Sequence, residues 1–295
     1  MLKRKHLPIV PLAILLAVLG CGGSDSAGRM PAIDAPALSG LEIADHMRAL
    51  SSDEFLGRGP GHIGGERAAD YIARNFADIG LEAPNGSYFQ TVPMVGTTTD
   101  PSTASLSFEG PRGSVAASYL DGFVINAGDP EADGAGGEAE VVFVGYGITA
   151  PENDWDDFGD IDVAGKYVMI LVNDPPAPPS EPDLFGGVAM TYYGRWTYKY
   201  EEAARRGALG ALIVHETGPA GYPWSVVRGG WSGEQFALPP DPNGAPPAGL
   251  VGWISLEVAR ALLAAGGHDF DDLKADAAKR DFRAVPTGVV ARARV

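Results

Sequence analysis

Two helices near the start of the chain are predicted by apolar residues that recur every three or four positions. Ser39 and Glu42 have the spacing of a capping box, which marks the start of the first helix. Its apolar face consists of Leu41, Ala44, Met47 and Leu50. The second helix is predicted over 66–79, and Gly80 followed by Leu81 ends it, because glycine adopts the positive φ of a helix C-terminus. Its apolar face consists of Ala69, Ile72, Phe76 and Ile79.

Strands are predicted where the apolar pattern changes its period. Alternation at 88–95 and 103–108 indicates strands with one buried face. Continuous apolar runs indicate strands buried on both faces, and these lie at 141–144, 166–172 and 211–214. A helix is predicted over 197–206, between the last two of these runs. This strand, helix, strand order is typical of a parallel crossover unit.

The C-terminal part predicts two helices and a strand. The first helix begins near Ser255 and ends at 266–267, and the second covers 269–279. Residues 285–295 alternate again, and the sequence given ends within that pattern. We therefore expect partners for this strand beyond residue 295. We also expect 289–295 to pair with one of the early strands, because the chain around an inserted unit returns to its start.

The N-terminus has the pattern of an exported lipoprotein. Basic residues at 3–5 precede an apolar stretch at 7–19, which is too short to span a bilayer. The only cysteine, Cys21, follows Gly20 and resembles the lipidated cysteine of bacterial lipoproteins. We predict a signal peptide over 1–20, a flexible tether over 21–37 and a lipid anchor at Cys21, which would bind the protein to the membrane. The alternative is an ordinary signal peptide that contains a cysteine. The predicted location is the cell envelope, at the outer membrane, facing the periplasm or the exterior.

Charge excludes one class of partner. The formal net charge is −16, and it becomes −19 when the three basic residues of the signal peptide are removed. Phosphate binding needs a basic face, so no nucleic acid partner is expected.

Local catalytic motifs are absent from the sequence. Residues 59–64 match G-x-G-x-x-G, but no strand precedes them, so the glycines are interpreted as turn formers. His215 and Glu216 resemble the start of a zincin motif that lacks its second histidine, and His215 is predicted at a strand end. The acidic run at 153–160 is predicted to be a solvated turn, with an irregular calcium loop as the alternative. No H-x-D or G-x-S-x-G string occurs.

Two groups of segments resemble the exported zinc aminopeptidases that carry an inserted protease-associated domain. The first group resembles the N-terminal helices of the peptidase domain and comprises 50–61, 65–72 and 88–90. The second group resembles the protease-associated domain and comprises 143–148, 156–158, 165–166, 190–200, 207–216, 222–224 and 231–236. Together they extend over roughly 40–295.

The resemblance implies an α/β fold: an incomplete zinc-exopeptidase domain with an inserted protease-associated α/β domain. It assigns 38–108 to the N-terminal part of the peptidase domain, 109–283 to the protease-associated domain and 284–295 to a return strand. Enzymes of this family hold two zinc ions and release N-terminal amino acids from peptides. Their metal ligands follow the insert, and the only Glu-Glu pair here, Glu201-Glu202, lies inside it. We therefore expect no zinc in this chain and a catalytic half elsewhere.

Candidate substrate-cleft residues are Trp224, Arg228 and Trp231, because the insert of this family borders the active-site cleft. A position in the core is the alternative for both tryptophans. The alternative function is a non-catalytic envelope binding module built on a protease-associated domain. The N-terminal helices favour the peptidase, since a free module would not need them.

Overall fold

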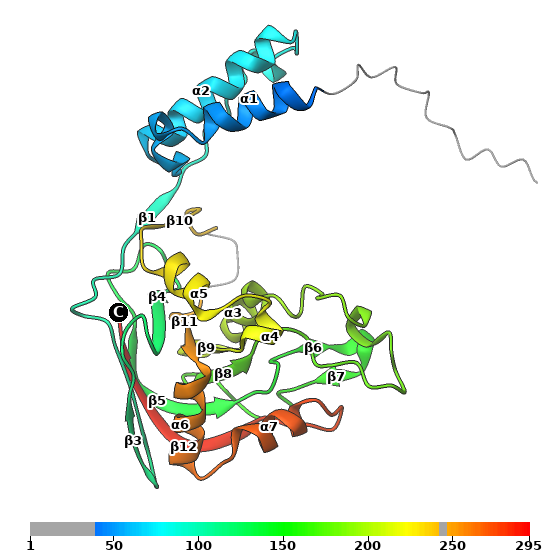
Figure 1. The fold of residues 1–295 in the computed structure, drawn as a ribbon. Coiled ribbons are helices and arrows are strands. Elements are labelled where there is room, and N and C mark those ends of the chain that lie inside the picture. Colours follow the sequence, from blue (N-terminus) through cyan, green and yellow to red (C-terminus); the bar gives the residue numbers. More distant parts are fainter. Residues whose placement is uncertain (1–38, 242–246) are drawn as a thin grey trace, which may run out of the picture. The chain divides into compact units, whose positions relative to one another are not determined.

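The computed structural model describes residues 39–241 and 247–295, and Figure 1 shows their fold. The predicted signal peptide, the tether and the lipidation site Cys21 lie outside the described residues. The chain divides into two compact units between Gly57 and Arg58. Each unit is described by itself.

Helix α1 (Gly40–Leu50) forms as predicted from its cap. The hydroxyl of Ser39 accepts a hydrogen bond from the Glu42 N–H at 3.3 Å, which satisfies one of the free donors of the first turn. No residue of α1 is buried, and its apolar side chains Leu41, Ile43 and Met47 are exposed. A short 3-10 segment, η1 (Asp53–Arg58), follows. The predicted apolar face of α1 is therefore present but uncovered.

Helix α2 (Ile63–Asp78) begins three residues before the predicted start and ends one residue before the predicted end, shortly before the predicted stop at Gly80. Gly80 has φ +78°, and the N–H of Leu81 donates to the Phe76 carbonyl at 3.0 Å. Only small residues of α2 are buried, namely Gly64, Ala68 and Ala73. Its larger apolar residues Ile72, Phe76 and Ile79 are exposed.

The predicted strand at 88–95 is wrong for all but its last residue. A 3-10 turn, η2 (Pro84–Gly86), precedes it, and the first strand is β1 (Val95–Thr97). Two features explain why residues 88–94 do not pair as a β-strand. The Tyr88 ring contacts the Phe76 ring, with centroids 6.3 Å apart, and Pro93 has no N–H to donate.

An eight-stranded sheet in the order β3-β2-β12-β5-β8-β9-β11-β4 forms the centre of the second unit (Figure 1). Its strands are β2 (Ser105–Gly110), β3 (Gly113–Ala116), β4 (Phe123–Ala127), β5 (Gly136–Phe143), β8 (Tyr167–Leu171), β9 (Gly210–His215), β11 (Leu250–Ser255) and β12 (Val285–Arg294). The four neighbours β5, β8, β9 and β11 are parallel, and the outer strands are antiparallel. Two small ribbons pair β1 with β10 (Gln235–Ala237), and β6 (Thr149–Ala150) with β7 (Trp155–Asp156).

Helices cover both faces of this sheet. The helices are α3 (Trp196–Arg205), α4 (Thr217–Ala220), α5 (Trp224–Trp231), α6 (Leu256–Gly266) and α7 (Phe270–Ala277), with 3-10 turns η3 (Pro151–Asn153) and η4 (Leu184–Gly186). One core contains Phe143 of the sheet with Leu262 of α6 and Phe270 of α7. The other contains the adjacent Val142 with Ala203 of α3. Adjacent strand residues thus enter opposite cores, which confirms the α/β class and explains the strands with continuous apolar sequence.

The crossover unit is confirmed, because β8 and β9 pair in parallel and α3 connects them. The predicted helices at the C-terminus are confirmed as α6 and α7. Ser255 caps α6 by accepting the Val258 N–H, and Asp269 caps α7 by accepting from Asp271 and Asp272.

Strand β12 corrects one expectation and confirms another. It pairs with β2 on one side and with β5 on the other, so the partners of residues 285–294 lie within this chain and not beyond residue 295. Pairing of 289–295 with the early strand at 103–108 is confirmed, whereas pairing with 88–95 is not found. The sheet crosses the expected boundaries at 108 and 283, and the domain assignment stays a prediction. No helix within 39–241 or 247–295 is long and apolar enough to cross a membrane.

Candidate functional site

Trp224, the first predicted cleft residue, is held in a structural position at the start of α5. Its indole N–H donates to the Leu120 carbonyl at 2.8 Å, and its ring lies 5.5 Å from the His215 ring. The side chain is half-buried against the core beneath α5. Trp224 therefore anchors the start of α5, and its indole N–H is already used in this hydrogen bond.

Arg228 is exposed on the same helix and pairs with Asp121, with 3.2 Å between Nη1 and Oδ1. An ion pair between exposed side chains contributes about 0–1 kcal/mol. Arg228 lines none of the pockets described below.

Trp231, at the end of α5, is the predicted residue that does face a hollow. Its ring centroid lies 6.5 Å from that of Trp196 and 6.3 Å from that of Tyr200. An open pocket of about 380 Å³ lies beside it, and we call it the aromatic pocket. Its lining comprises Trp196, Trp231, Tyr222, Trp253, Asn126, Gln235, Val226, Val227 and Gly230. The structure thus brings together Trp231 and residues that the sequence alone did not single out.

A second, larger hollow lies at the carboxyl ends of the parallel strands, where ligands bind in many α/β folds. This strand-end pocket measures about 670 Å³. Tyr146 follows β5, Asn173 and Asp174 follow β8, and Lys274 of α7 joins them. A proline-rich loop at 175–179 forms much of the remaining wall. The signal that could have located it is a polar Asn-Asp pair directly after a buried strand.

Beneath this pocket lies Lys199 of α3, which is completely buried. Its ammonium donates to the Tyr146 carbonyl at 2.5 Å and to the Asn173 carbonyl at 3.1 Å. Burial lowers the pKa of Lys199 to about 7, and the nearby carboxylates of Asp157 and Asp174 act in the opposite direction. Lys199 therefore ties the ends of β5 and β8 together.

Asp157 corrects the prediction of a solvated acidic turn at 153–160. The side chain is buried, and it accepts hydrogen bonds from the Ile148 N–H and the Trp155 indole N–H, each at 2.9 Å. Burial raises the pKa of Asp157 to about 7, while these hydrogen bonds and Lys199 lower it. The neighbouring Asp154 and Asp156 are exposed, so the run is divided between core and surface.

The remaining candidate metal and catalytic residues have structural partners. Glu202 accepts from Arg205, Arg206 and Thr149 at 2.7–3.0 Å. His215 ends β9 as predicted, with its Nε2 3.0 Å from the Tyr222 carbonyl, and burial lowers its pKa. Among the described residues, no group of three His, Cys, Asp or Glu side chains could hold a metal ion.

The glycines at 59–64 form a turn, as interpreted from the sequence. Gly61 has φ +72°, and a Cβ there would lie 2.9 Å from the Phe236 ring. His62 contacts the residue before β10, with its Nε2 2.9 Å from the Glu234 carboxylate. These glycines therefore form a turn with a close approach, and no strand leads into it.

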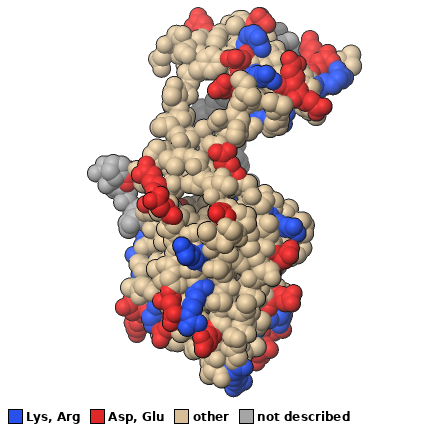
Figure 2. All heavy atoms as spheres, turned by 90° about the vertical axis from the view of Figure 1, so that its left-hand side faces the viewer, with Lys and Arg blue, Asp and Glu red and all other residues tan. Residues whose placement is uncertain are grey.

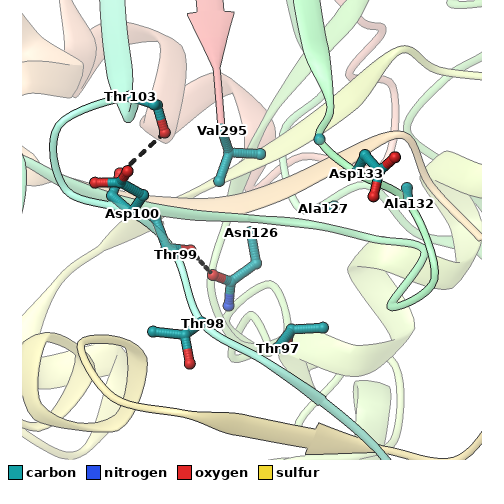
Figure 3. A pocket seen from close by; sticks show the side chains of 11 residues that line it. Thr97, Thr98, Thr99, Asp100, Thr103, Asn126, Ala127, Ala132, Asp133 and Val295 are labelled. Carbon is teal, nitrogen blue, oxygen red and sulfur yellow. Dashed lines mark hydrogen bonds between the residues drawn. The ribbon is translucent and has the colours of Figure 1, made fainter.

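A third hollow, of about 170 Å³, is lined by Thr97, Thr98, Thr99, Asp100 and Asn126 among others (Figure 3). Its polar groups are largely paired with one another. Thr99 donates to the Asn126 Oδ1 at 2.5 Å, and Thr103 donates to the Asp100 carbonyl at 3.1 Å. The charged side chains of its lining are Asp100 and Asp133, and the lining contains no basic residue.

Surface charge is mixed on the face drawn in Figure 2, where acidic and basic side chains are interspersed. Ion pairs also connect neighbouring strands of the sheet, as in the contacts of Arg292 with Glu109 and Glu138.

Comparison with known proteins gave structural neighbours only. No family model matches the chain, and no curated protein matches it. An aminopeptidase from Aneurinibacillus sp. strain AM-1 is similar at 18% identity and a TM-score of 0.40, over 85% of this chain and 43% of that one. BSAP, a zinc aminopeptidase from Bacillus subtilis, is similar at 17% identity and a TM-score of 0.32, over 74% and 40%. The chain thus spans less than half the length of these two structures.

Proposed function

We propose that this chain supplies the N-terminal helices and the protease-associated domain of an exported zinc aminopeptidase. The metal ligands would come from residues outside these 295. In that assembly zinc would activate the water that attacks the peptide bond. The part described here would border the cleft and bind the peptide.

The observation that carries this proposal is the uncovered apolar surface of the two N-terminal helices. Leu41 of α1 is 79% exposed, and Phe76 of α2 is 42% exposed. An amphipathic helix is stable when its apolar face is covered by another part of the protein. A catalytic peptidase domain is the part that the sequence resemblance at 50–61 and 65–72 implies.

The residues that carry the second resemblance support the proposal because they contact one another. Lys199, in the 190–200 segment, donates to the carbonyl of Tyr146, in the 143–148 segment, at 2.5 Å. The rings of Tyr200 and Trp231, from two of the segments, lie with centroids 6.3 Å apart, and Nε2 of His215 lies 3.0 Å from the Tyr222 carbonyl. Several of the segments that carry the resemblance therefore pack against one another.

A stand-alone binding module is the second candidate, and one observation favours it. Strand β12 is paired on both sides within this chain, and the sheet has helices on both faces. Such a unit needs no further strand at that position. A binding module, however, does not explain why α1 and α2 expose their apolar side chains.

The genomic DNA after codon 295 separates the two candidates. An open reading frame that continues in frame, or a neighbouring gene, encoding an H-x-D string and a later Glu-Glu pair would support the peptidase. A stop codon followed by unrelated sequence would contradict it and leave the module.

Export and lipidation are part of the same proposal. We expect the mature chain to begin at Cys21 with a diacylglyceryl group on its thiol and an acyl group on its amine, since two lipid signals give stable anchoring. Mass spectrometry of the membrane fraction tests this. An unmodified N-terminus at another residue would contradict it.

A further inference from the structure

We propose that the aromatic pocket binds a large apolar side chain of an extended peptide and hydrogen-bonds the main chain of that residue. The inference names the substrate class of the proposed peptidase and rests on that proposed function, because a peptide is taken as the ligand. It adds a specific site with identified donors.

The walls of the pocket suit one large apolar side chain. Trp196 comes from the start of α3, Trp231 from the end of α5, Tyr222 from the loop before α5 and Trp253 from β11. Trp196 remains 44% exposed, so its ring is accessible to a ligand. Aromatic rings from four separate elements line the pocket, so a bound side chain could contact more than one ring. Offset and edge-to-face contacts would then stabilise an aromatic or branched aliphatic group.

Trp253 forms the base of the pocket. It lines the pocket although its side chain is only 1% exposed. Its ring centroid lies 6.1 Å from that of His215, so the ring is held by the core and offers the ligand an apolar surface.

Asn126 provides a hydrogen-bond donor from β4. Its Oδ1 accepts from the Thr99 hydroxyl, and Figure 3 shows the amide nitrogen turned away from Thr99. That nitrogen has no hydrogen bond to another described residue. Gln235 complements the donors, because its Nε2 binds the carbonyls of Gly233 and Glu234 and leaves Oε1 as an acceptor. The lining can therefore pair the C=O and the N–H of one peptide group.

The absence of charged side chains from the pocket lining favours an uncharged part of the ligand. No Asp, Glu, Lys or Arg belongs to the pocket lining. A free amine or carboxylate would have no countercharge there, and burying an unpaired charge is costly. The pocket therefore suits an internal residue of a peptide and not the terminal residue that carries the amine.

Blocked tripeptides test the inference on the chain from Cys21 onward, by titration calorimetry or nuclear magnetic resonance. We expect acetyl-Gly-Phe-Gly-amide and its Leu analogue to bind, and acetyl-Gly-Gly-Gly-amide and the Glu analogue to bind at least about tenfold more weakly. Equal binding of all four peptides, or binding of none, would overturn the inference. Competition by neutral oligosaccharides with no peptide binding would assign the pocket to glycans and also overturn it.

Variants locate the binding. Trp231→Ala is expected to weaken the Phe peptide at least about tenfold, and Asn126→Asp, which keeps the acceptor for Thr99 but removes the amide donors, about three- to tenfold. Arg228→Ala is the matched control, because Arg228 lies on the same helix but does not line the pocket, and its affinity should stay unchanged. Val226→Glu, a charge at the exposed rim, replaces Trp231→Ala if that variant fails to fold. Unchanged affinity in a folded rim or wall variant would overturn the inference.

Failure of this inference can be told apart from failure of the proposed function. Peptide binding requires neither zinc nor turnover, so it is measured independently of the downstream DNA. A catalytic continuation without peptide binding would refute only the pocket. Peptide binding without a catalytic continuation would support the pocket within the binding module.

Discussion

The eight-stranded sheet and the two N-terminal helices use their apolar residues in opposite ways. Phe108 of β2 is 1% exposed, and both faces of the sheet carry continuous cores. Helices α1 and α2 have equally regular apolar stripes, but the large residues of those stripes are exposed. The two regions therefore differ in what covers their apolar positions and not in how regular the pattern is.

This difference indicates which part of the chain covers its apolar residues by its own packing. The sheet region (95–295) has strands paired in register, capped helices and two closed cores. The N-terminal helices α1 and α2 have caps and stops but little burial. Since most helix stability in proteins comes from packing of the apolar face, they are expected to depend on another folded part.

The largest expected contrast is in amide hydrogen exchange. Amides of β8, β9 and β11 should exchange only through global unfolding, whereas those of α1 and α2 should exchange through local opening. With a global stability of several kcal/mol, we expect protection factors that differ by about 10³ or more. Mass spectrometry of the isolated chain measures this. Equal protection in α1 and β9 would break the comparison.

A matched pair of phenylalanines gives the next largest effect. Phe108→Ala removes a buried ring and should lower the free energy of unfolding by about 3–5 kcal/mol. Phe76→Ala removes a ring that is 42% exposed and should change it by less than about 1 kcal/mol. Urea titrations followed by circular dichroism compare them. Similar losses in both variants would mean that α2 is packed as tightly as the sheet.

The pH dependence of stability should also come from the sheet region. The pKa of Asp157 is raised to about 7, so from about pH 4 to pH 7 the folded state binds more protons and the free energy of unfolding falls as pH rises. The pKa of Lys199 is lowered to about 7, so from pH 7 to about pH 10 the unfolded state binds more protons and stability rises with pH.

We therefore expect a minimum of stability near pH 7, with a contribution of about 2 kcal/mol on its alkaline side. Lys199→Met should remove the rise above pH 7, and because Lys199 lowers the pKa of Asp157, it should also extend the fall caused by Asp157 to higher pH. The urea unfolding midpoints of the unchanged chain and of this variant, measured from pH 5 to pH 9, test this prediction. An identical alkaline rise in this variant would show that other groups are responsible.

The smallest expected effect comes from removing the N-cap residues of α7 and α1. Asp269→Ala removes two hydrogen bonds at the start of α7 and should cost about 1 kcal/mol of global stability. Ser39→Ala removes the cap of α1 and should accelerate exchange in α1 without changing the global midpoint. A shift of the midpoint by the Ser39 variant would tie α1 to the cooperative core.

The sequence predicted helices and strands well where their boundaries depend on interactions between residues close in sequence. Caps at Ser39 and Ser255 and the glycine after α2 depend on nearby residues, so their patterns are readable. Continuous apolar runs located the buried strands for the same reason. The strand at 88–95 failed because its tyrosine is held by a ring contact with α2.

The sites depend on residues far apart in the sequence, and periodicity does not reveal them. Lys199 lies in a helix with charged neighbours, yet its two carbonyl partners are 53 and 26 positions away. The aromatic pocket gathers Asn126, Trp196, Trp231 and Trp253 from four elements. Of the predicted cleft residues only Trp231 lines it. The family resemblance indicated Trp224 and Trp231 as aromatic candidates, but only the folded chain shows which aromatic residues lie together.

The central claim is that this chain binds and positions a peptide but does not supply the catalytic zinc. The direct measurement is zinc content after dialysis together with hydrolysis of aminoacyl chromogenic substrates by the purified chain. We predict substoichiometric zinc and no turnover above background, because a catalytic zinc needs three protein ligands and a water. Stoichiometric zinc with turnover that a chelator abolishes would contradict the claim.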